Sequence, residues 1–394
     1  MEPLCVTTWI APLQPALPGL GEHELDELRN LETHLVQALA TRADRRTSTD
    51  LLALRRHLAA LGQPDAVPDL APPASALTDA LAAFLCGFYD LDLRDAVGTG
   101  HGRMILRHAC EPVRRHWAAR LAAGDLVGIA VTERHGGSRL QEITTRATEQ
   151  PGGGWLLNGE KCWVSRLTEA SGFVIFFKDP AGELTAAVLD ANTPGLRRRS
   201  IAPAGLGGWA WGNLSLTDVP LHPRDLLGTT GDGLRVFRRH FAQFRPLVAA
   251  TALGTAAGVH TAVTADLTNR LNTRRVRHLR DNALITLGRT HAELNAALLH
   301  ALGAASITAA GSPQGDIWSR GVKAHAVDTA HRATTELSLL VGALAFQAHS
   351  SLAKARADLG GLLFADGIHD ALQRSVGRAL TTTRSAQQPH PLAS

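Results

Sequence analysis

Residues 126–138 read LVGIAVTERHGGS and residues 157–165 read LNGEKCWVS, and these two segments decide the fold. The first six positions are apolar and partly β-branched, so we expect a short buried strand over 126–131 that leads into a glycine–serine turn. Such a turn presents backbone N–H groups and a hydroxyl, which suits a diphosphate or a polar heterocycle. A flat ring could lie beside Trp163, with the Ser165 hydroxyl as a hydrogen-bonding partner. The alternative is a β domain in which Trp163 belongs to the core and Ser165 is an ordinary strand residue.

Composition favours a large protein with long helices. The chain has 394 residues, of which 45% are hydrophobic, which is enough for two or three domains. Ala, Leu and Arg dominate, and this favours long helices over a β-sandwich. The net charge is +4 and the arginines are scattered along the chain. This spread argues against a nucleic-acid surface but permits an anionic partner such as a phosphopantetheine carrier.

The cysteines Cys5, Cys86, Cys110 and Cys162 lie far apart, without a CxxC pair or a histidine at metal-ligand spacing. We therefore expect neither a disulfide framework nor a metal site, and a reducing cytoplasm as the location. The N-terminus lacks the basic region of a signal peptide. No apolar run reaches the length of a membrane span, so we expect no membrane association.

Hydrophobic periodicity divides the chain into an α, a β and a second α part, which is an α+β fold. Helical patterns over 22–61, 76–88 and 104–123 predict an N-terminal α-helical domain over residues 1–125. Short strands separated by turns predict a small β-barrel or sandwich over 126–228. We expect these strands at 139–148, 155–158, 172–178, 184–190 and 213–218.

The helical period resumes after Gly233 and predicts a C-terminal four-helix bundle over 229–385, followed by a tail at 386–394. A glycine-bearing loop with Gly360, Gly361 and Gly367 is expected before the last helix. We expect the four helices at 234–270, 282–309, 314–345 and 369–383. One further glycine-rich segment, GTGHG at 98–102, is not GxGxxG and follows no strand, so we expect a loop over a pocket and not a Rossmann turn.

The motifs and their order resemble the acyl-CoA dehydrogenase superfamily. TERHGGS at 132–138 looks like the TEPxAGSD turn of that family, and LNGEKCWVS at 157–165 resembles its LNGxKxW strand. The likeness covers roughly residues 100–385. Further segments match in the expected order: NTPG at 192–195, GGW at 207–209, DVP at 218–220, LLG at 226–228 and GDG at 231–233.

The resemblance implies FAD bound where the β domain meets the C-terminal bundle. Thr132 would face the pyrimidine edge of the flavin. Gly137 and Ser138 would hold the diphosphate, and Trp163 with Ser165 would flank N5. In such a site the protein tunes the electronics of the flavin while the cofactor carries out the redox chemistry.

The far end of the implied cofactor site departs from the family pattern. Arg270 falls where the family has an arginine that reaches the FAD of a neighbouring subunit, so we expect a homo-oligomer, a dimer or a tetramer. Arg139 replaces an aspartate of the turn. Thr273 and Arg274 stand where the family has Phe-Gly, and Leu339, Gly342 and Ala343 stand where a glutamine and paired glycines are usual.

The resemblance also implies a catalytic base in the loop before the last helix. In the family a glutamate followed by glycine removes the α-proton of a thioester while the β-hydrogen leaves as hydride to flavin N5. Asp366, followed by Gly367, holds that place here; the alternative base position, just before Arg245, is Phe244. Aspartate is one methylene shorter than glutamate, and a misplacement of about 1 Å can slow a reaction on the order of a hundredfold. The alternative role of Asp366 is to cap the final helix.

We therefore expect an FAD-dependent dehydrogenase that acts on an acyl thioester, carried either on CoA or on an acyl carrier protein, in a biosynthetic pathway. Two alternatives stay open at this point. One is a flavin oxidase or monooxygenase on the same fold. The other is a relative without flavin that serves as a binding or scaffold subunit.

Overall fold

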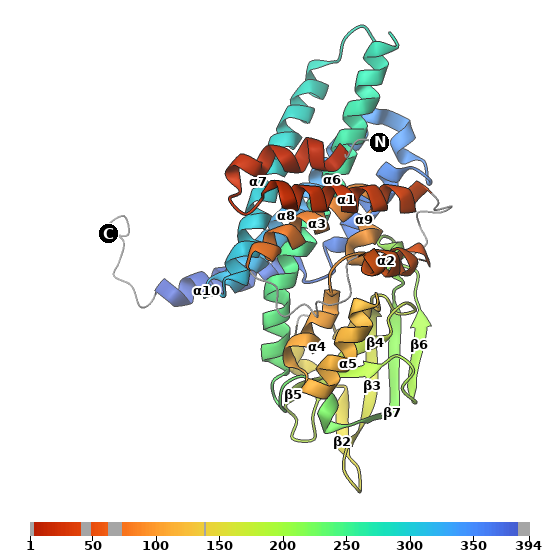
Figure 1. Ribbon diagram of the computed structural model, residues 1–394, viewed down its shortest axis with the longest axis vertical. Coiled ribbons are helices and arrows are strands. Elements are labelled where there is room, and N and C mark those ends of the chain that lie inside the picture. Colours follow the sequence, from red (N-terminus) through yellow and green to blue (C-terminus); the bar gives the residue numbers. More distant parts are fainter. Residues whose placement is uncertain (1–3, 41–48, 62–72, 138, 385–394) are drawn as a thin grey trace.

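The computed structural model describes residues 4–40, 49–61, 73–137 and 139–384. Its helices gather in the upper part of Figure 1, and the β-sheet lies below them with α4 and α5 beside it. The order is N-terminal helices, sheet and C-terminal helices, which confirms the expected α+β layout.

The N-terminal part is helical, as the leucine spacing predicts. The expected single helix over 104–123 is wrong, because the chain is extended at Ala109 and Cys110 and a new helix starts just before Pro112. Proline is favoured in the first turn of a helix and disfavoured in its interior, so the break belongs there. The helices are α1 (Glu22–Ala40), α2 (Thr49–Leu61), α3 (Pro73–Tyr89), α4 (Arg103–His108) and α5 (Glu111–Ala122).

The middle part is one seven-stranded sheet in the order β1-β4-β2-β3-β7-β6, with β5 paired to β4. Of the expected strand 139–148, only the end is a strand. The strand β6, which carries three consecutive arginines, was not expected; it lies at the edge of the sheet and its side chains are mostly exposed. The strands are β1 (Val127–Ala130), β2 (Arg146–Glu149), β3 (Trp155–Val164), β4 (Gly172–Lys178), β5 (Leu184–Asp190), β6 (Leu196–Ser200) and β7 (Gly212–Leu221).

The strand β4 is buried on both faces, which explains its continuous apolar sequence. Phe173, Ile175 and Phe177 pack into a core within the sheet. Val174 and Phe176 face the other way and pack against residues of α4, α5 and α6. The sheet is thereby fixed to the helical part of the molecule.

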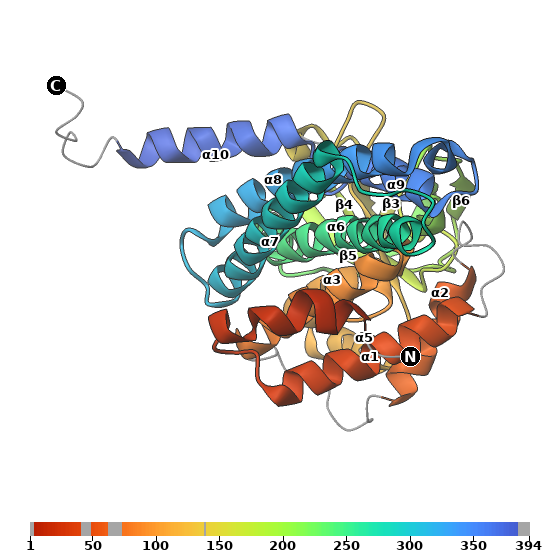
Figure 2. The same ribbon diagram turned by 90° about the horizontal axis from the view of Figure 1, so that it is seen from above.

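The C-terminal helices are α6 (Gly233–Asn272), α7 (Asp281–Ala309), α8 (Gly315–Val341), α9 (Ser351–Leu362) and α10 (His369–Arg384). Figure 2 shows α10 running beside α8 and projecting beyond the bundle. The sequence pattern predicts that Gly360 and Gly361 lie in a loop, but they lie in the helix α9. A side chain at position 361 would meet Leu206 at 2.8 Å, so this glycine serves a close helix–loop contact.

The long helix α6 crosses the middle of the molecule. By length and composition alone it could span a membrane, contrary to the expectation that no run is long enough, but 72% of its apolar window is buried inside the fold. It crosses α3 at backbone contact: a Cβ atom at Gly254 would lie 1.9 Å from the carbonyl oxygen of Phe84, and one at Gly87 would lie 2.0 Å from that of Thr251. Glycine is required at this crossing because no side chain fits.

Candidate functional site

A cavity of about 1290 Å³ opens between the sheet and the C-terminal helices. Its walls are the turn after β1, the end of β3, the helices α6 and α8, and the loop between α9 and α10. Five residues singled out from the sequence line this one cavity, although the last of them is far along the chain from the other four: Thr132, Gly137, Trp163, Ser165 and Asp366.

The other two expected site residues are not in the cavity as described. Ser138 lies outside the described residues. Arg270 lies away from the cavity, where its guanidinium forms an ion pair with Asp266 at 2.7 Å and donates to the carbonyl of Val341. Arg270 therefore contacts the last residue of α8.

The turn after β1 can be built only with glycine. Gly136 has a φ of +120°, which is outside the range of most side-chain-bearing residues. A Cβ atom at Gly137 would lie 2.6 Å from the Thr132 hydroxyl oxygen, so the glycine leaves the hydroxyl and the backbone free to face the cavity.

Glu133 anchors this turn to the sheet, a role that the sequence did not reveal. Its carboxylate accepts from Lys161 Nζ at 2.8 Å, from the backbone N–H of Thr144 and Thr145 at 2.8 and 3.0 Å, and from both their hydroxyls. Burial raises the pKa of Glu133, but the hydrogen bonds from Lys161, Thr144 and Thr145 outweigh it and bring that pKa to about 2. An ionised Glu133 thus fixes the turn at any physiological pH.

Trp163 is turned out of the sheet and into the cavity. Its φ is +56°, and it lies where the β3–β7 register shifts, so the strand bulges at this point. The side chain is 56% exposed, and its ring lies 6.2 Å from that of Trp211 in an edge-on arrangement. Ser165, two residues further on, is buried at the cavity wall. A large aromatic ring left uncovered beside a cavity is suited to a flat ligand.

Asp366 reaches the cavity from the loop between α9 and α10. Its φ is +56° and that of Gly367 is +115°, so the chain reverses in a left-handed conformation. One carboxylate oxygen accepts from Arg94 Nη1 at 3.1 Å, and the side chain is only 11% exposed. Among the described residues, the hydrogen bonds of this carboxylate include none from a backbone N–H of α10, so the helix-cap alternative gains no support.

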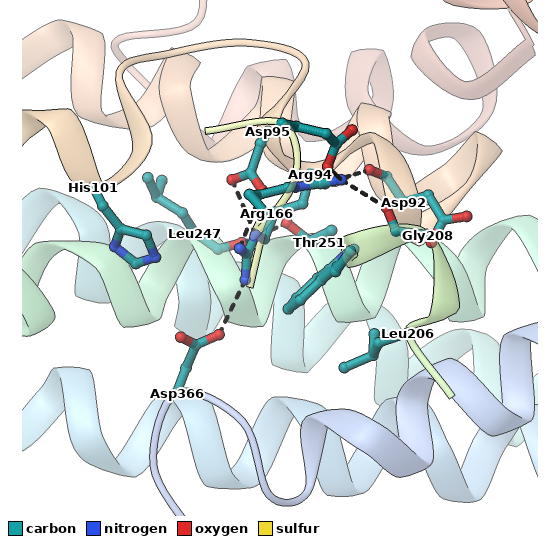
Figure 3. Close-up of polar contacts among 12 residues, drawn as sticks. Asp92, Arg94, Asp95, His101, Arg166, Leu206, Gly208, Leu247, Thr251 and Asp366 are labelled. Atoms are coloured by element: carbon teal, nitrogen blue, oxygen red, sulfur yellow. Dashed lines mark hydrogen bonds and ion pairs between the residues drawn. The ribbon is translucent and has the colours of Figure 1, made fainter. Parts of the chain in front are cut away.

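Behind Asp366 lies a buried charge network that the sequence analysis missed (Figure 3). Arg94 binds Asp95 through two nitrogens at 3.2 Å, and Arg166 Nε binds the same carboxylate at 2.8 Å. Burial alone raises the pKa of Asp95, but the two guanidinium groups hold it well below its usual range. The sequence signal was weak: charges alternate with leucines in LDLRD at 91–95.

Arg245 holds the backbone of the same loop. Its Nε donates to the carbonyl of Asp366 at 3.3 Å, and burial lowers the pKa of Arg245 to about 10. The preceding Phe244 is buried and offers no carboxylate. Arg94 therefore holds the carboxylate of Asp366, while Arg245 holds its backbone carbonyl.

A cluster of three buried carboxylates lies outside the cavity. Asp90, Asp92 and Asp358 have oxygens close enough together to hold a metal ion. The Lys354 ammonium lies among them, at 2.7, 3.0 and 2.6 Å respectively. An internal ammonium group already pairs with all three carboxylates of this cluster.

Two family models match the chain: the acyl-CoA dehydrogenase middle domain over residues 128–219 and the acyl-CoA dehydrogenase C-terminal domain over residues 231–381. The chain belongs to the acyl-CoA dehydrogenase superfamily. The boundary between the two matches falls between β7 and α6, where the sheet gives way to the helices.

Members of the acyl-CoA dehydrogenase superfamily resemble the chain in sequence and in fold. The glutaryl-CoA dehydrogenase of Desulfococcus multivorans is 28% identical over 158 residues, which are 39% of this chain and 40% of the relative. The chain thus spans about two fifths of that relative. Butyryl-CoA dehydrogenase from Megasphaera elsdenii has a TM-score of 0.81 at 20% identity over 92% of this chain and 99% of that one. The prolyl acyl carrier protein oxidase AnaB has a TM-score of 0.70 at 21% identity, over 77% and 83%. These two likenesses concern the fold.

The cavity residues fit FAD, the cofactor of the acyl-CoA dehydrogenase family. Gly136 and Gly137 line the cavity without side chains, so a diphosphate could approach their backbone, and the uncovered Trp163 offers a face to the ring system. Arg139, where the family has aspartate, forms an ion pair with Glu142 at 3.1 Å, so its charge is partly compensated. The residues that are atypical for the adenosine end, Leu339 and Ala343, are exposed and lie off the cavity.

Proposed function

We propose that this protein is an FAD-dependent dehydrogenase of an acyl thioester in which Asp366 is the general base. The observation that carries the proposal is that Asp366 lines the same cavity as Trp163 and Ser165. Bound FAD supplies the hydride acceptor. Asp366 takes the α-proton of the thioester while the β-hydrogen leaves with its electron pair, so a carbon–carbon double bond forms in the acyl group.

The roles proposed for Thr132, Gly137, Trp163 and Ser165 follow from their places at the cavity, and the role of Ser138 follows from the family motif alone. Gly137 and Ser138 hold the diphosphate, and the Thr132 hydroxyl faces the pyrimidine edge of the flavin. Trp163 covers the ring system near N5 together with Ser165. The contact from Arg94 holds the Asp366 carboxylate at the cavity.

The substrate class is an acyl thioester on CoA or on an acyl carrier protein, in a biosynthetic pathway. The guanidinium groups of Arg139, Arg238 and Arg320 at the cavity support an anionic pantetheine phosphate. The fold neighbours include an enzyme of each kind, one for butyryl-CoA and one for a prolyl carrier protein. The atypical aspartate base is the reason to favour a specialised pathway.

We further propose a homo-oligomer, a dimer or a tetramer, located in the cytoplasm. Large apolar side chains near the end of α8, Leu339, Leu344 and Phe346, are exposed close to the chain segment that Arg270 contacts. Exposed apolar patches of this kind commonly mark protein–protein contacts. The four cysteines are free thiols, in keeping with a reducing compartment.

The test is the visible spectrum of the purified protein, followed by anaerobic titration with butyryl-CoA and with acyl groups on a carrier protein. We expect a yellow protein whose flavin absorbance bleaches with a thioester, and an Asp366→Asn variant that keeps the flavin but does not bleach. Reoxidation by oxygen with release of peroxide would instead favour the oxidase alternative. A colourless protein that refuses added FAD would overturn the proposal in favour of a scaffold role.

A further inference from the structure

Lys323 is a fully buried lysine on α8 that the proposed reaction does not use. Its ammonium donates to two backbone carbonyls, those of Leu362 and Gly367, each at 2.7 Å. These two carbonyls lie on either side of residues 363–366, the segment that ends in Asp366. One side chain therefore ties together both ends of the loop that carries the carboxylate.

The first of these contacts is at a helix end. Leu362 is the last residue of α9, and the last carbonyls of a helix have no partner within it. A positive charge at this end is also favoured by the helix dipole. The Lys323 ammonium thus provides a buried C-terminal cap for α9.

The second contact is at the chain reversal. Asp366 and Gly367 both have positive φ angles, and a left-handed conformation is strained at a residue other than glycine. Such a conformation persists where the surrounding contacts fix it. Here Lys323 holds the carbonyl of Gly367, and Arg245 holds that of Asp366.

We propose that Lys323 is a positioning residue that sets the place of the Asp366 carboxylate by clamping its loop at both ends. The clamp itself does not depend on the proposed function. Its effect on catalysis does, because it requires Asp366 to be the base. Burial lowers the pKa of Lys323 to about 7; the nearby Asp366 raises that pKa by a smaller amount, and Arg245 lowers it further. A neutral amine still has two N–H groups, enough for two carbonyls, so the clamp does not depend on the charge.

The clamp can be tested with Lys323→Met, which keeps the length of the side chain and removes its donors. Lys323→Arg, which keeps donors, serves as the conservative variant. Val327→Ala is the matched control, because Val327 is a fully buried residue of the same helix and belongs to the hydrophobic core. The three variants are compared by flavin content, thermal stability, steady-state kinetics and hydrogen exchange of residues 360–370.

For Lys323→Met we expect kcat to fall on the order of a hundredfold, with KM and flavin content little changed, because the carboxylate is displaced by about 1 Å. Hydrogen exchange in residues 363–368 should accelerate. Lys323→Arg should recover part of kcat, and Val327→Ala should lower stability while kcat and exchange in the loop stay near wild type.

The inference is overturned if Lys323→Met leaves hydrogen exchange in the loop unchanged. It is also overturned if Val327→Ala, at an equal loss of stability, lowers kcat as much as Lys323→Met does. If exchange accelerates but Asp366→Asn retains full activity, the clamp stands and the role of Asp366 as base fails. Should Lys323→Met not fold, Lys323→Gln, whose shorter chain keeps a donor but reaches less far, gives the same comparison.

Discussion

Arg94 donates to the Asp366 carboxylate at 3.1 Å while its guanidinium lies 3.6 Å from the centre of the Trp209 ring. Two further nitrogens of this guanidinium bind Asp95. The Arg94 guanidinium stacks on Trp209 and is hydrogen-bonded to Asp95, so it has little freedom to move with the Asp366 carboxylate. Asp366 therefore meets a cation whose position is set by other residues.

Replacing Arg94 should weaken both the fold and the reaction. Arg94→Met leaves Asp366 without its cation and Asp95 with Arg166 alone, and breaking a buried ion pair destabilises by about 3 kcal/mol or more. kcat should fall as well, because the Asp366 carboxylate loses the contact that fixes its position. Chemical denaturation and steady-state kinetics measure the two effects. Arg103→Met, which removes a more exposed ion pair with Asp79, should change stability by less than about 1 kcal/mol.

Asp366 should be essential for proton abstraction but not for cofactor binding. Loss of a general base lowers the rate by about 10²–10⁴-fold, so Asp366→Asn should reduce kcat within that range. Asp366→Glu keeps a carboxylate in a loop held for the shorter side chain, so its kcat should lie between those of wild type and the Asn variant. Rapid-mixing measurements of flavin reduction would give these rates. Equal rates for Asp366→Asn and wild type would rule out this base.

The turn glycine should control flavin affinity. Gly137→Ala places a methyl group 2.6 Å from the Thr132 hydroxyl oxygen, which must rotate away from the cavity. We expect a lower ratio of flavin absorbance to protein absorbance and a weaker Kd for added FAD. Gly303→Ala is the control, since its Cβ meets no atom within 4 Å and alanine favours a helix by up to about 1 kcal/mol. An unchanged Kd in Gly137→Ala would contradict the assignment of this turn to FAD.

Acid should destabilise the fold through a buried histidine pair. His101 Nδ1 lies 3.0 Å from His240 Nε2, and burial, helped by the Arg94 charge, lowers the pKa of His101 to about 4. Above pH 6.5 the ring is neutral in both folded and unfolded chains, so it has no effect. As the pH falls from 6.5 to 4, the unfolded chain takes up the proton first, and stability drops by about 3 kcal/mol in all.

Scanning calorimetry between pH 4 and pH 8 measures this loss. His101→Gln keeps a hydrogen-bonding side chain but does not titrate, so its stability should fall less steeply below pH 6.5. His23→Gln, at an exposed position on α1, should follow the wild-type curve. A wild-type curve that is flat between pH 4.5 and 6.5 would show that the pair is not held neutral.

The local motifs explain how much of the site could be predicted. Thr132, Gly137, Trp163 and Ser165 lie within one short stretch, where strand pattern and turn chemistry act between neighbours, and they do line one cavity. Arg94 was missed because its function depends on a contact with Asp366, 272 positions away. No local sequence pattern predicts a contact between residues so far apart in the chain.

The helix α9 was missed for a different reason. Gly360 and Gly361 lower helix propensity and imitate a loop signal, yet they sit inside a helix that approaches the loop at Leu206. Tertiary contact overrides the local preference there. The same contact places the end of α9, and with it the start of the loop that carries Asp366, at the cavity.

The glycine crossing of α3 and α6 also affects the positions of residues around the cavity. Arg94 follows the end of α3 by only five residues, and Arg245 belongs to α6, the other partner of the crossing. The distance between the two helix axes at Gly254 and Gly87 therefore sets how far apart the two guanidinium groups stand around Asp366. The electrostatic environment of the Asp366 carboxylate therefore depends on the backbone spacing in the core, which Gly87 and Gly254 set because they have no side chains.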